Sequence, residues 1–200
     1  MSENRQRLPD YYNLPVPPFG APRPALLIIG LAPGLHGANR SGRPFTGDFA
    51  GLLLYETLFE LGLATRTRSV AVDDGLELKG VRITNAVKCV PPQNKPTPVE
   101  IRTCNHYLAQ ELRQFVGVRA ILALGRVAHD SVLMALAVPR SSRAFGHGTV
   151  HSLADGRTLV DSYHCSRYNT QTKRLTHTMF RDVMRVAAGH AGLPTAERPP

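Results

Sequence analysis

The chain has 200 residues, 42% hydrophobic and 20% charged, which suits one globular domain. Its 24 lysines and arginines against 15 aspartates and glutamates give a formal net charge of +9, which favours a polyanionic partner such as nucleic acid. No stretch approaches the ~20 apolar residues that span a bilayer, and residues 1–13 lack the apolar core of a signal peptide. Three cysteines are too few for a disulfide framework, so we expect a cytosolic protein that does not bind membranes.

The first 24 residues are polar and then rich in proline, with the run LPVPPFGAPRP. Because proline fixes φ and lacks a backbone N–H, this composition predicts an extended lead-in that wraps the domain rather than a helix. We expect residues 25–190 to form a single domain and residues 191–200 a flexible tail.

Within the domain, short apolar runs rich in β-branched residues alternate with helical patterns. The runs predict buried parallel strands at 25–29, 81–87, 120–124 and 158–162. Helices are predicted at 52–63 (or from residue 49), 97–115, 126–136 and 176–188. The alternation predicts a three-layer α/β/α fold with a mainly parallel central sheet.

An unusual polar or glycine-rich segment sits at the end of each predicted strand. The four segments are GLAPG, NAVKC, GRVAH and YHCSRYN. Since ligands of open α/β sheets bind at the carboxyl ends of the strands, we expect the functional site at this edge.

The first of these segments opens the stretch GLAPGLHGANRSGRPFTGD, residues 30–48. It matches neither G-x-G-x-x-G nor G-x-x-x-x-G-K-[ST], so no nucleotide cofactor is predicted. What remains is a glycine-lined loop whose N–H groups can approach a ligand closely.

Four side chains near these strand ends have both a structural and a functional interpretation. Phe45 can stack on a flat ligand or pack in the core. Asp48 can cap the next helix, or act as a base or as an electrostatic partner for positive charge. Asn85 can read the edge of an imide base, and His164 can hydrogen-bond a carbonyl oxygen that gains negative charge, although a lone histidine is more often structural.

Two further groups of residues are candidates for binding. Basic residues after the fourth strand, Arg167, Lys173 and Arg174, can hold the His164 loop against nucleic-acid phosphates. Cys89 and Cys104 flank a proline-rich loop; a metal or cluster site needs about four ligands, so they are half a site or two unpaired cysteines.

The three motifs GLAPG-x-HG-x-NR-x-GRPFTGD, TNAVKCVPPQNKPTP with a later cysteine, and H-x-S-x-x-N-x-QT-x-RLT occur in this order. Together they resemble the family 5 (B-type) uracil-DNA glycosylases, with similarity from about residue 14 to 175. The resemblance implies a parallel-sheet α/β monomer that flips uracil, or another deaminated base, out of DNA. Such an enzyme hydrolyses the N-glycosidic bond without a lyase step and leaves an abasic site for base excision repair. The alternative is a non-catalytic damage sensor that uses the same pocket.

The resemblance also assigns roles to individual residues. It implies catalytic roles for Asp48, Asn85 and His164. It places in the base pocket Gly30, Leu31, Ala32, Pro33, Gly34, His36 and Phe45. Contacts to DNA are implied for Arg43, Ser166, Arg167, Asn169 and Arg174.

The family carries a [4Fe–4S] cluster on four cysteines, and Cys89 and Cys104 match the later pair. Residues 1–24 contain no cysteine that would match the earlier pair. Either the cluster is absent or the natural chain starts upstream of Met1, and we expect the second.

Overall fold

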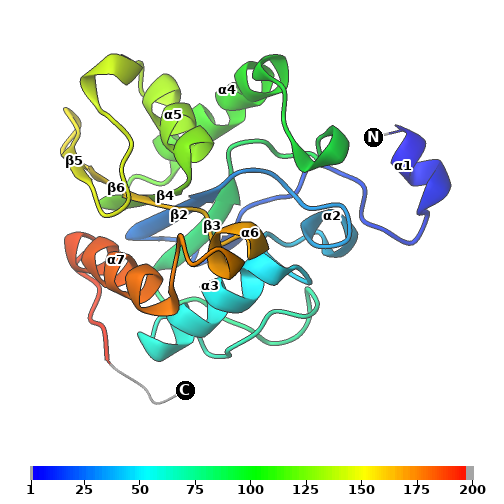
Figure 1. Cartoon of the computed structure of the whole chain (residues 1–200), viewed down its shortest axis with the longest axis horizontal. Helices are drawn as coiled ribbons and strands as arrows, with labels where there is room; N and C mark the ends of the chain where they lie inside the picture. Colours follow the sequence, from blue (N-terminus) through cyan, green and yellow to red (C-terminus); the bar gives the residue numbers. More distant parts are fainter. Residues whose placement is uncertain (1, 197–200) are drawn as a thin grey trace.

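The protein is a six-stranded sheet between two layers of helices, in a computed structural model that describes residues 2–196 (Figure 1). The strand order is β1-β3-β2-β4-β6-β5. The four inner strands pair in parallel and the edge strands β1 and β5 pair antiparallel. The predicted three-layer fold with a mainly parallel sheet is confirmed.

All four predicted strands are present. Their bounds are Leu26–Gly30 (β2), Val81–Asn85 (β3), Ala120–Leu124 (β4) and Thr158–Ser162 (β6), and the edge strands are Phe19–Gly20 (β1) and Val150–Ser152 (β5). The second strand ends at Asn85, two residues earlier than predicted.

The four long helices also match their predictions to within a few residues. They are Phe49–Glu60 (α3), Pro98–Gln114 (α4), Arg126–Ala135 (α5) and His177–His190 (α7). Three short helices are Ser2–Arg7 (α1), Ala38–Ser41 (α2) and Arg167–Gln171 (α6), with 3-10 turns at Pro92–Asn94 and Arg140–Ser142. Helix α4 begins with a capping box between Thr97 and Glu100.

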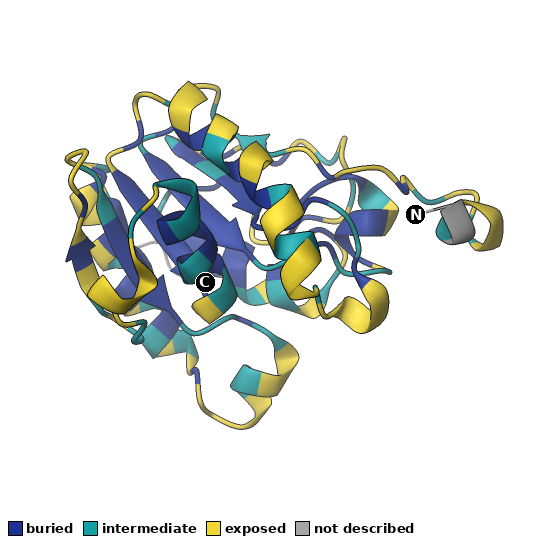
Figure 2. Ribbon diagram, turned by 90° about the horizontal axis from the view of Figure 1, so that it is seen from above, coloured by how far each residue is buried: buried dark blue, intermediate teal, exposed yellow. Residues whose placement is uncertain are grey.

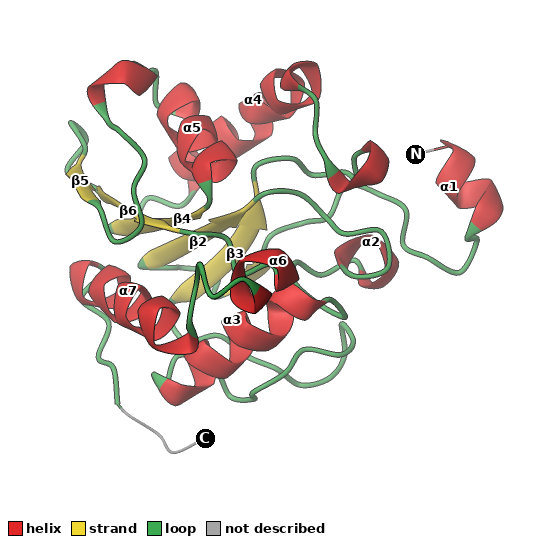
Figure 3. Cartoon of the chain, in the orientation of Figure 1, coloured by secondary structure: helices red, strands yellow, loops and turns green. Residues whose placement is uncertain are grey.

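The core lies on both faces of the sheet, because successive side chains of a strand point to opposite faces. Leu26 and Ile28 pack with α3 and α7, whereas Leu27 and Ile29 pack with α4 and α5. Figures 2 and 3 show the buried strands between the two helix layers. The helices occupy the faces and leave the carboxyl edge of the sheet to loops.

The lead-in is partly helical, so the prediction that it contains no helix is wrong for Ser2–Arg7. This run precedes the first proline, Pro9, and nothing in it prevents helical hydrogen bonds. The remainder of the lead-in makes hydrogen bonds to the domain. The Val16 N–H donates to the Lys88 carbonyl at 2.8 Å, and the Asn39 amide donates to the Asn13 side chain at 2.9 Å.

The expected tail begins with residues that pack against the domain. Ala191 is fully buried, Leu193 contacts the core, and the Ala196 N–H donates to the Leu61 carbonyl at 3.3 Å. Residues 197–200 lie outside the described part of the chain. Among the described helices, none combines the length and apolarity that crossing a membrane requires.

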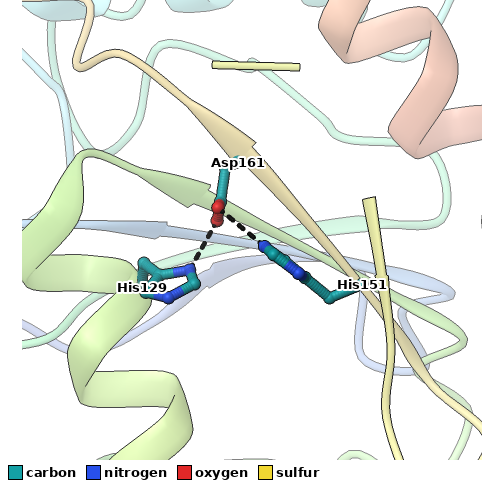
Figure 4. Close-up of side chains that lie close together, drawn as sticks. All are labelled: His129, His151 and Asp161. Carbon is teal, nitrogen blue, oxygen red and sulfur yellow. Dashed lines mark hydrogen bonds and ion pairs between the residues drawn. The ribbon is translucent and has the colours of Figure 1, made fainter. Parts of the chain in front are cut away.

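A buried polar network joins β6, β5 and α5 (Figure 4). Asp161 lies between two histidine rings, with Oδ1 2.8 Å from His129 Nδ1 and Oδ2 3.0 Å from His151 Nε2. His129 Nε2 faces the carbonyl oxygen of Arg143 at 3.0 Å. A carbonyl and an ionised carboxylate only accept, so both ring nitrogens of His129 donate, and the ring is an imidazolium paired with the buried Asp161 carboxylate.

The pKa of His129 agrees with this arrangement. Burial by itself lowers the pKa, but the hydrogen bond and charge of Asp161 outweigh burial and raise it above the ordinary 6.5. A raised folded-state pKa means that the stabilisation is complete below pH 6.5 and is lost as the pH rises through the folded-state value.

We therefore expect His129→Gln to cost about 3–5 kcal/mol of unfolding free energy at pH 5.5, because it leaves the Asp161 carboxylate buried without its cation. The deficit relative to the unsubstituted protein should shrink steadily towards pH 9. Urea denaturation across this pH range measures it, with exposed His190→Gln as the control. A deficit that grows with pH would contradict the ion-pair assignment.

Candidate active site

The site forms where β2 and β3 end side by side. Gly30 and Asn85 are paired in the parallel register of these strands. A Cβ placed on Gly30 would lie 2.4 Å from Asn85 Oδ1 and 2.6 Å from Phe45 Cζ. Only glycine fits here, and its missing side chain brings the amide of Asn85 and the ring of Phe45 together.

Phe45 packs in the core, which confirms its structural interpretation, and stacking on a ligand stays a prediction. It is 5% exposed and packs with the hydrophobic cluster on the α3 side of the sheet. Its ring also faces that of His164, with centroids 6.0 Å apart and planes 26° apart. Its φ of +56° is unusual for a bulky residue and is held by Gly51, whose Cα packs against the Phe45 carbonyl.

Asp48 is the N-cap of α3, but the cap uses only one of its two carboxylate oxygens. Oδ1 accepts from the Gly51 N–H at 2.8 Å. Oδ2 lies towards the loop before it, since a Cβ on Gly37 would stand 2.8 Å from this oxygen. Burial raises the pKa of Asp48, opposed by the N–H groups of Gly51 and Ala50. A partly desolvated carboxylate of this kind can stabilise a positive charge that develops beside it.

His164 follows β6 and is held from its backbone. The Asn169 side-chain amide donates to the His164 carbonyl at 2.8 Å, and Ser166 caps the short helix α6 that carries Asn169. No described residue hydrogen-bonds the His164 ring nitrogens. Burial lowers the pKa of His164 to about 4, so the ring is neutral at neutral pH and has one N–H to donate.

The loop after β2 presents free backbone donors. The carbonyls of Gly30 and Leu31 accept from Ala86 and Val87. Within residues 2–196, by contrast, no acceptor takes the N–H of Ala32 or Gly34. Between them Pro33 is buried.

His36 points outward from this loop. It is exposed, and its Nδ1 lies 3.0 Å from the hydroxyl of Tyr11 in the lead-in. The structure therefore does not bring His36 together with Gly30, Asn85 and Phe45, because its ring is turned to the lead-in side.

The expectation that Arg43 contacts DNA is corrected by the structure. Its side chain is 6% exposed and ion-paired with Asp74 at 2.7 Å. It also donates to Ser69 and to the Val72 carbonyl. Burial would raise the pKa of Asp74, but the bond from Arg43 and three backbone N–H groups hold it well below its usual range. Arg43 therefore anchors the 69–74 loop to the loop that carries Phe45.

Arg167 and Arg174 are exposed beside the His164 loop, as their predicted role requires. The Arg167 guanidinium lies 5.1 Å from the centre of the Phe49 ring, and that of Arg174 lies 4.5 Å from the centre of Tyr163. These contacts orient the cations without neutralising them.

Lys88 is the lysine of the second motif, in the segment NAVKC. Its Nζ is buried and donates to Glu111 at 2.7 Å, to Thr84 at 2.7 Å and to the Asn85 carbonyl at 2.9 Å. All three donors of the ammonium are used, so Lys88 supports the end of β3 and is not available as a nucleophile.

Cys89 and Cys104 lie near each other. Burial raises the pKa of the Cys89 thiol, and the neighbouring Cys104 raises it further. A hollow of about 430 Å³ opens beside Cys89, lined also by Arg7 and Glu100. The third cysteine, Cys165, is buried next to His164. Cys89 and Cys104 supply half of a four-cysteine site, so the residues present do not fit a [4Fe–4S] cluster.

His129, His151 and Asp161 are close enough to share a metal ion, since their ligand atoms lie within 4.8 Å of one another. Each of these atoms already has a hydrogen-bond partner in the group. A metal would require His129 to lose a proton that the network holds. The network is therefore assigned a structural role.

The sequence did not single out Arg126 or Phe145, which lie at the same sheet edge beside Tyr163. The available signal was their place in the segments GRVAH and AFGHG, next to the ends of two strands.

Comparisons with known proteins bear on this arrangement. The family model described as "Uracil DNA glycosylase superfamily" matches residues 17–188. The chain is 49% identical to the type-5 uracil-DNA glycosylase of Thermus thermophilus, covering 92% of this chain and 83% of that protein. It is 44% identical to that of Pyrobaculum aerophilum (91% and 79%) and 46% to that of Mycobacterium tuberculosis (92% and 69%).

We expect Arg43→Gln to lower the unfolding free energy by about 3–5 kcal/mol, because it leaves Asp74 as an unpaired buried carboxylate. At a temperature where the variant is folded, its affinity for DNA should be unchanged within about twofold. Chemical denaturation and fluorescence anisotropy measure the two quantities, and exposed Arg40→Gln is the matched control. Normal stability with much weaker DNA binding would reinstate Arg43 as a DNA contact.

Proposed function

The chain belongs to the uracil-DNA glycosylase superfamily and, within it, to the type-5 family, and on that premise we propose that it excises uracil from DNA by hydrolysis of the N-glycosidic bond. The observation that carries the proposal is the convergence of Gly30, Phe45 and Asn85 at one point of the sheet edge, with His164 facing Phe45. A buried glycosidic bond cannot be reached within a duplex, so the nucleotide is flipped into this point.

The base is recognised by stacking and by hydrogen bonds. Phe45 offers an aromatic face. The Asn85 amide can accept from N3–H and donate to O4 of uracil, and no described residue competes for it. Because Asn85 Oδ1 and the Phe45 ring already pack against Gly30, the base binds beside these two groups and not in the space over Gly30.

Bond cleavage separates charge, and the site contains a group for each sign. As the C1′–N1 bond lengthens, the sugar becomes oxocarbenium-like and the base becomes an anion. The neutral His164 ring and the free N–H groups of Ala32 and Gly34 donate to the uracil anion. Asp48 stabilises the sugar cation and orients the attacking water. Lys88 cannot form a Schiff base because its Nζ is fully hydrogen-bonded, which supports a monofunctional reaction.

Several properties are part of the proposal and rest on the sequence and the family. The chain acts as a monomer in the cytosol, on uracil and on other deaminated bases. Arg167 and Arg174, exposed beside His164, hold the DNA backbone, with Ser166 and Asn169 shaping their loop. A [4Fe–4S] cluster stays a prediction of the resemblance alone, because Cys89 and Cys104 supply only two of the four thiolates that it needs.

The first test replaces Asp48 with asparagine, which keeps the helix cap and removes the charge. Single-turnover release of uracil from duplex DNA should fall by about 100-fold or more, with DNA affinity kept within about threefold. Exposed Asp73→Asn is the control and should leave the rate unchanged. Undiminished excision by the Asp48 variant would overturn its role, and wild-type protein that binds uracil-containing DNA without releasing uracil would favour a damage sensor.

A second test concerns the base pocket. Gly30→Ala places a methyl group within 2.4 Å of Asn85 Oδ1 and 2.6 Å of Phe45, so we expect excision to fall by at least about tenfold. Gly189→Ala is the matched control, because nothing lies within 4 Å of its added Cβ. Single-turnover kinetics with a thermal melt of each variant measure the effect. Equal rates for the two variants would show that excision does not depend on the close packing of Asn85 and Phe45 against Gly30.

A further inference from the structure

The loop that leads into α3 turns sharply at Phe45. The Thr46 N–H donates to the Arg43 carbonyl at 3.4 Å, which closes a reverse turn with Pro44 and Phe45 at its centre. A proline followed by a residue of positive φ is typical of a type II turn, whose third position favours glycine. Phe45 occupies this position with a φ of +56°. A large aromatic side chain therefore stands where the backbone favours glycine, and backbone outliers of this kind cluster at functional sites.

Both peptide groups beside Phe45 are held by the fold. Before it, the Pro44 carbonyl accepts two hydrogen bonds, from the Tyr55 hydroxyl at 2.8 Å and from the Thr46 hydroxyl at 3.3 Å. After it, the Phe45 carbonyl packs against Gly51, where an added Cβ would lie only 1.8 Å from the carbonyl oxygen. Because the two peptide planes determine φ and ψ of the residue between them, these contacts fix the direction in which the Phe45 ring points.

The Thr46 hydroxyl belongs to a directed chain of hydrogen bonds that begins at a cation. The Arg43 guanidinium only donates, so the Ser69 hydroxyl, 3.1 Å away, accepts from it. Ser69 then has its own hydrogen to donate to Thr46, 2.7 Å away, and Thr46 donates to the Pro44 carbonyl. Hydrogen bonds in such a chain polarise one another, and the charged donor strengthens the first of them.

Tyr55 is the second support of the Pro44 carbonyl and comes from α3. Its side chain is fully buried, and burial raises the pKa of Tyr55 above its ordinary value of 10.0, so the phenol keeps the proton that it donates. Thr46 is also fully buried, and Ser69 is 8% exposed. Since solvent does not compete for these bonds, the network holds the turn rigidly.

The ring that this network directs lies at the proposed active site. The ring centroids of Phe45 and His164 are 6.0 Å apart, and Phe45 Cζ packs against Gly30 at the end of β2. The attraction between an aromatic ring and a flat base depends on the angle at which they meet. Phe45 can therefore stack on a flipped base only while its backbone keeps the φ of +56°.

We propose that Tyr55 and Thr46 are positioning residues of the glycosylase reaction, which hold the Phe45 ring against the flipped base through the Pro44 carbonyl. This rests on the proposed excision of uracil from DNA. Neither residue needs to contact the base, since each acts through Phe45. Their contribution to the rate should therefore disappear when the aromatic ring is absent.

The experiment is a double-mutant cycle between the hydroxyls and the ring. Tyr55→Phe and Thr46→Val each remove one hydroxyl with little change of volume, and Phe45→Leu removes the aromatic face but keeps an apolar side chain. Single-turnover release of uracil from duplex DNA is measured for the single and double variants, at a temperature where thermal melts show each of them folded. Tyr107→Phe and Thr103→Val are the matched controls, because both residues are exposed on α4.

Tyr55→Phe and Thr46→Val should each slow uracil release by about fivefold, the factor that corresponds to one hydrogen bond, with DNA affinity unchanged within about twofold. In the Phe45→Leu background, the same substitutions should change the rate by less than about twofold. Thr46→Ser restores the hydroxyl and should keep about half or more of the wild-type rate. The two control substitutions should leave the rate unchanged in both backgrounds.

A second substrate tests the same coupling while Phe45 is left in place. Dihydrouracil keeps the N3–H and carbonyl edge of uracil, but its saturated ring is puckered and stacks poorly on an aromatic face. Tyr55→Phe should therefore lower the rate on uracil by a larger factor than the rate on dihydrouracil.

Equal losses with and without the Phe45 ring would overturn the proposal, as would equal losses on uracil and dihydrouracil, because a general loss of structure affects them alike. A Thr46→Ser variant as slow as Thr46→Val would overturn it as well. Failure of the proposed function is distinguishable, since wild-type protein would then release no uracil from any substrate. Excision of uracil with losses that simply add overturns the positioning role alone.

Discussion

Gly30 and Asn85 lie opposite each other where β2 and β3 end, and the rest of the site depends on the close approach made there. A side chain on Gly30 would occupy the space shared by the Asn85 amide and the Phe45 ring. A register shift of one residue would turn Asn85 to the other face of the sheet. The parallel pairing that builds the core therefore also determines which polar group faces the base.

In the loop between β2 and α3, residues that stabilise the fold lie beside or coincide with residues of the proposed active site. Arg43 ties it to Asp74, Phe45 fills the core and faces His164, and Asp48 starts α3 with one oxygen. Because these roles are coupled, the loop cannot relax without losing a cap or an ion pair. That constraint explains how a bulky residue is kept at a φ of +56°.

Charge is distributed according to depth. Close to the base pocket, His164 is neutral and Asp48 is the nearby carboxylate. Cations gather further out, where Arg126, Arg167 and Arg174 lie exposed on aromatic rings. Because His164 is neutral, it leaves the negative charge of Asp48 available to stabilise the sugar cation. The exposed arginines attract the phosphates of the DNA backbone. The buried pair of His129 and Asp161 joins α5 to β6 and has a structural role.

Much of this arrangement could be predicted from sequence. Apolar runs determined the four inner strands, capping residues determined the start of α4, and the order of polar segments determined the edge that holds the site. The three motifs, through the family they resemble, indicated Asp48, Asn85 and His164. Local composition carries these features because periodicity, caps and turn residues act over a few positions.

The tertiary structure alone decided the partners of each side chain. Arg43 resembles a DNA contact in sequence, yet Asp74, 31 residues away, holds it inside the protein. His36 belongs to the matched motif, but Tyr11 of the lead-in holds its ring outside the pocket. Arg126 and Arg174 line one hollow at the ends of β4 and β6, and no local sequence pattern connects them. Burial and ion pairing depend on contacts between distant segments. The residue type therefore determines the functional group, and the fold determines which groups it contacts.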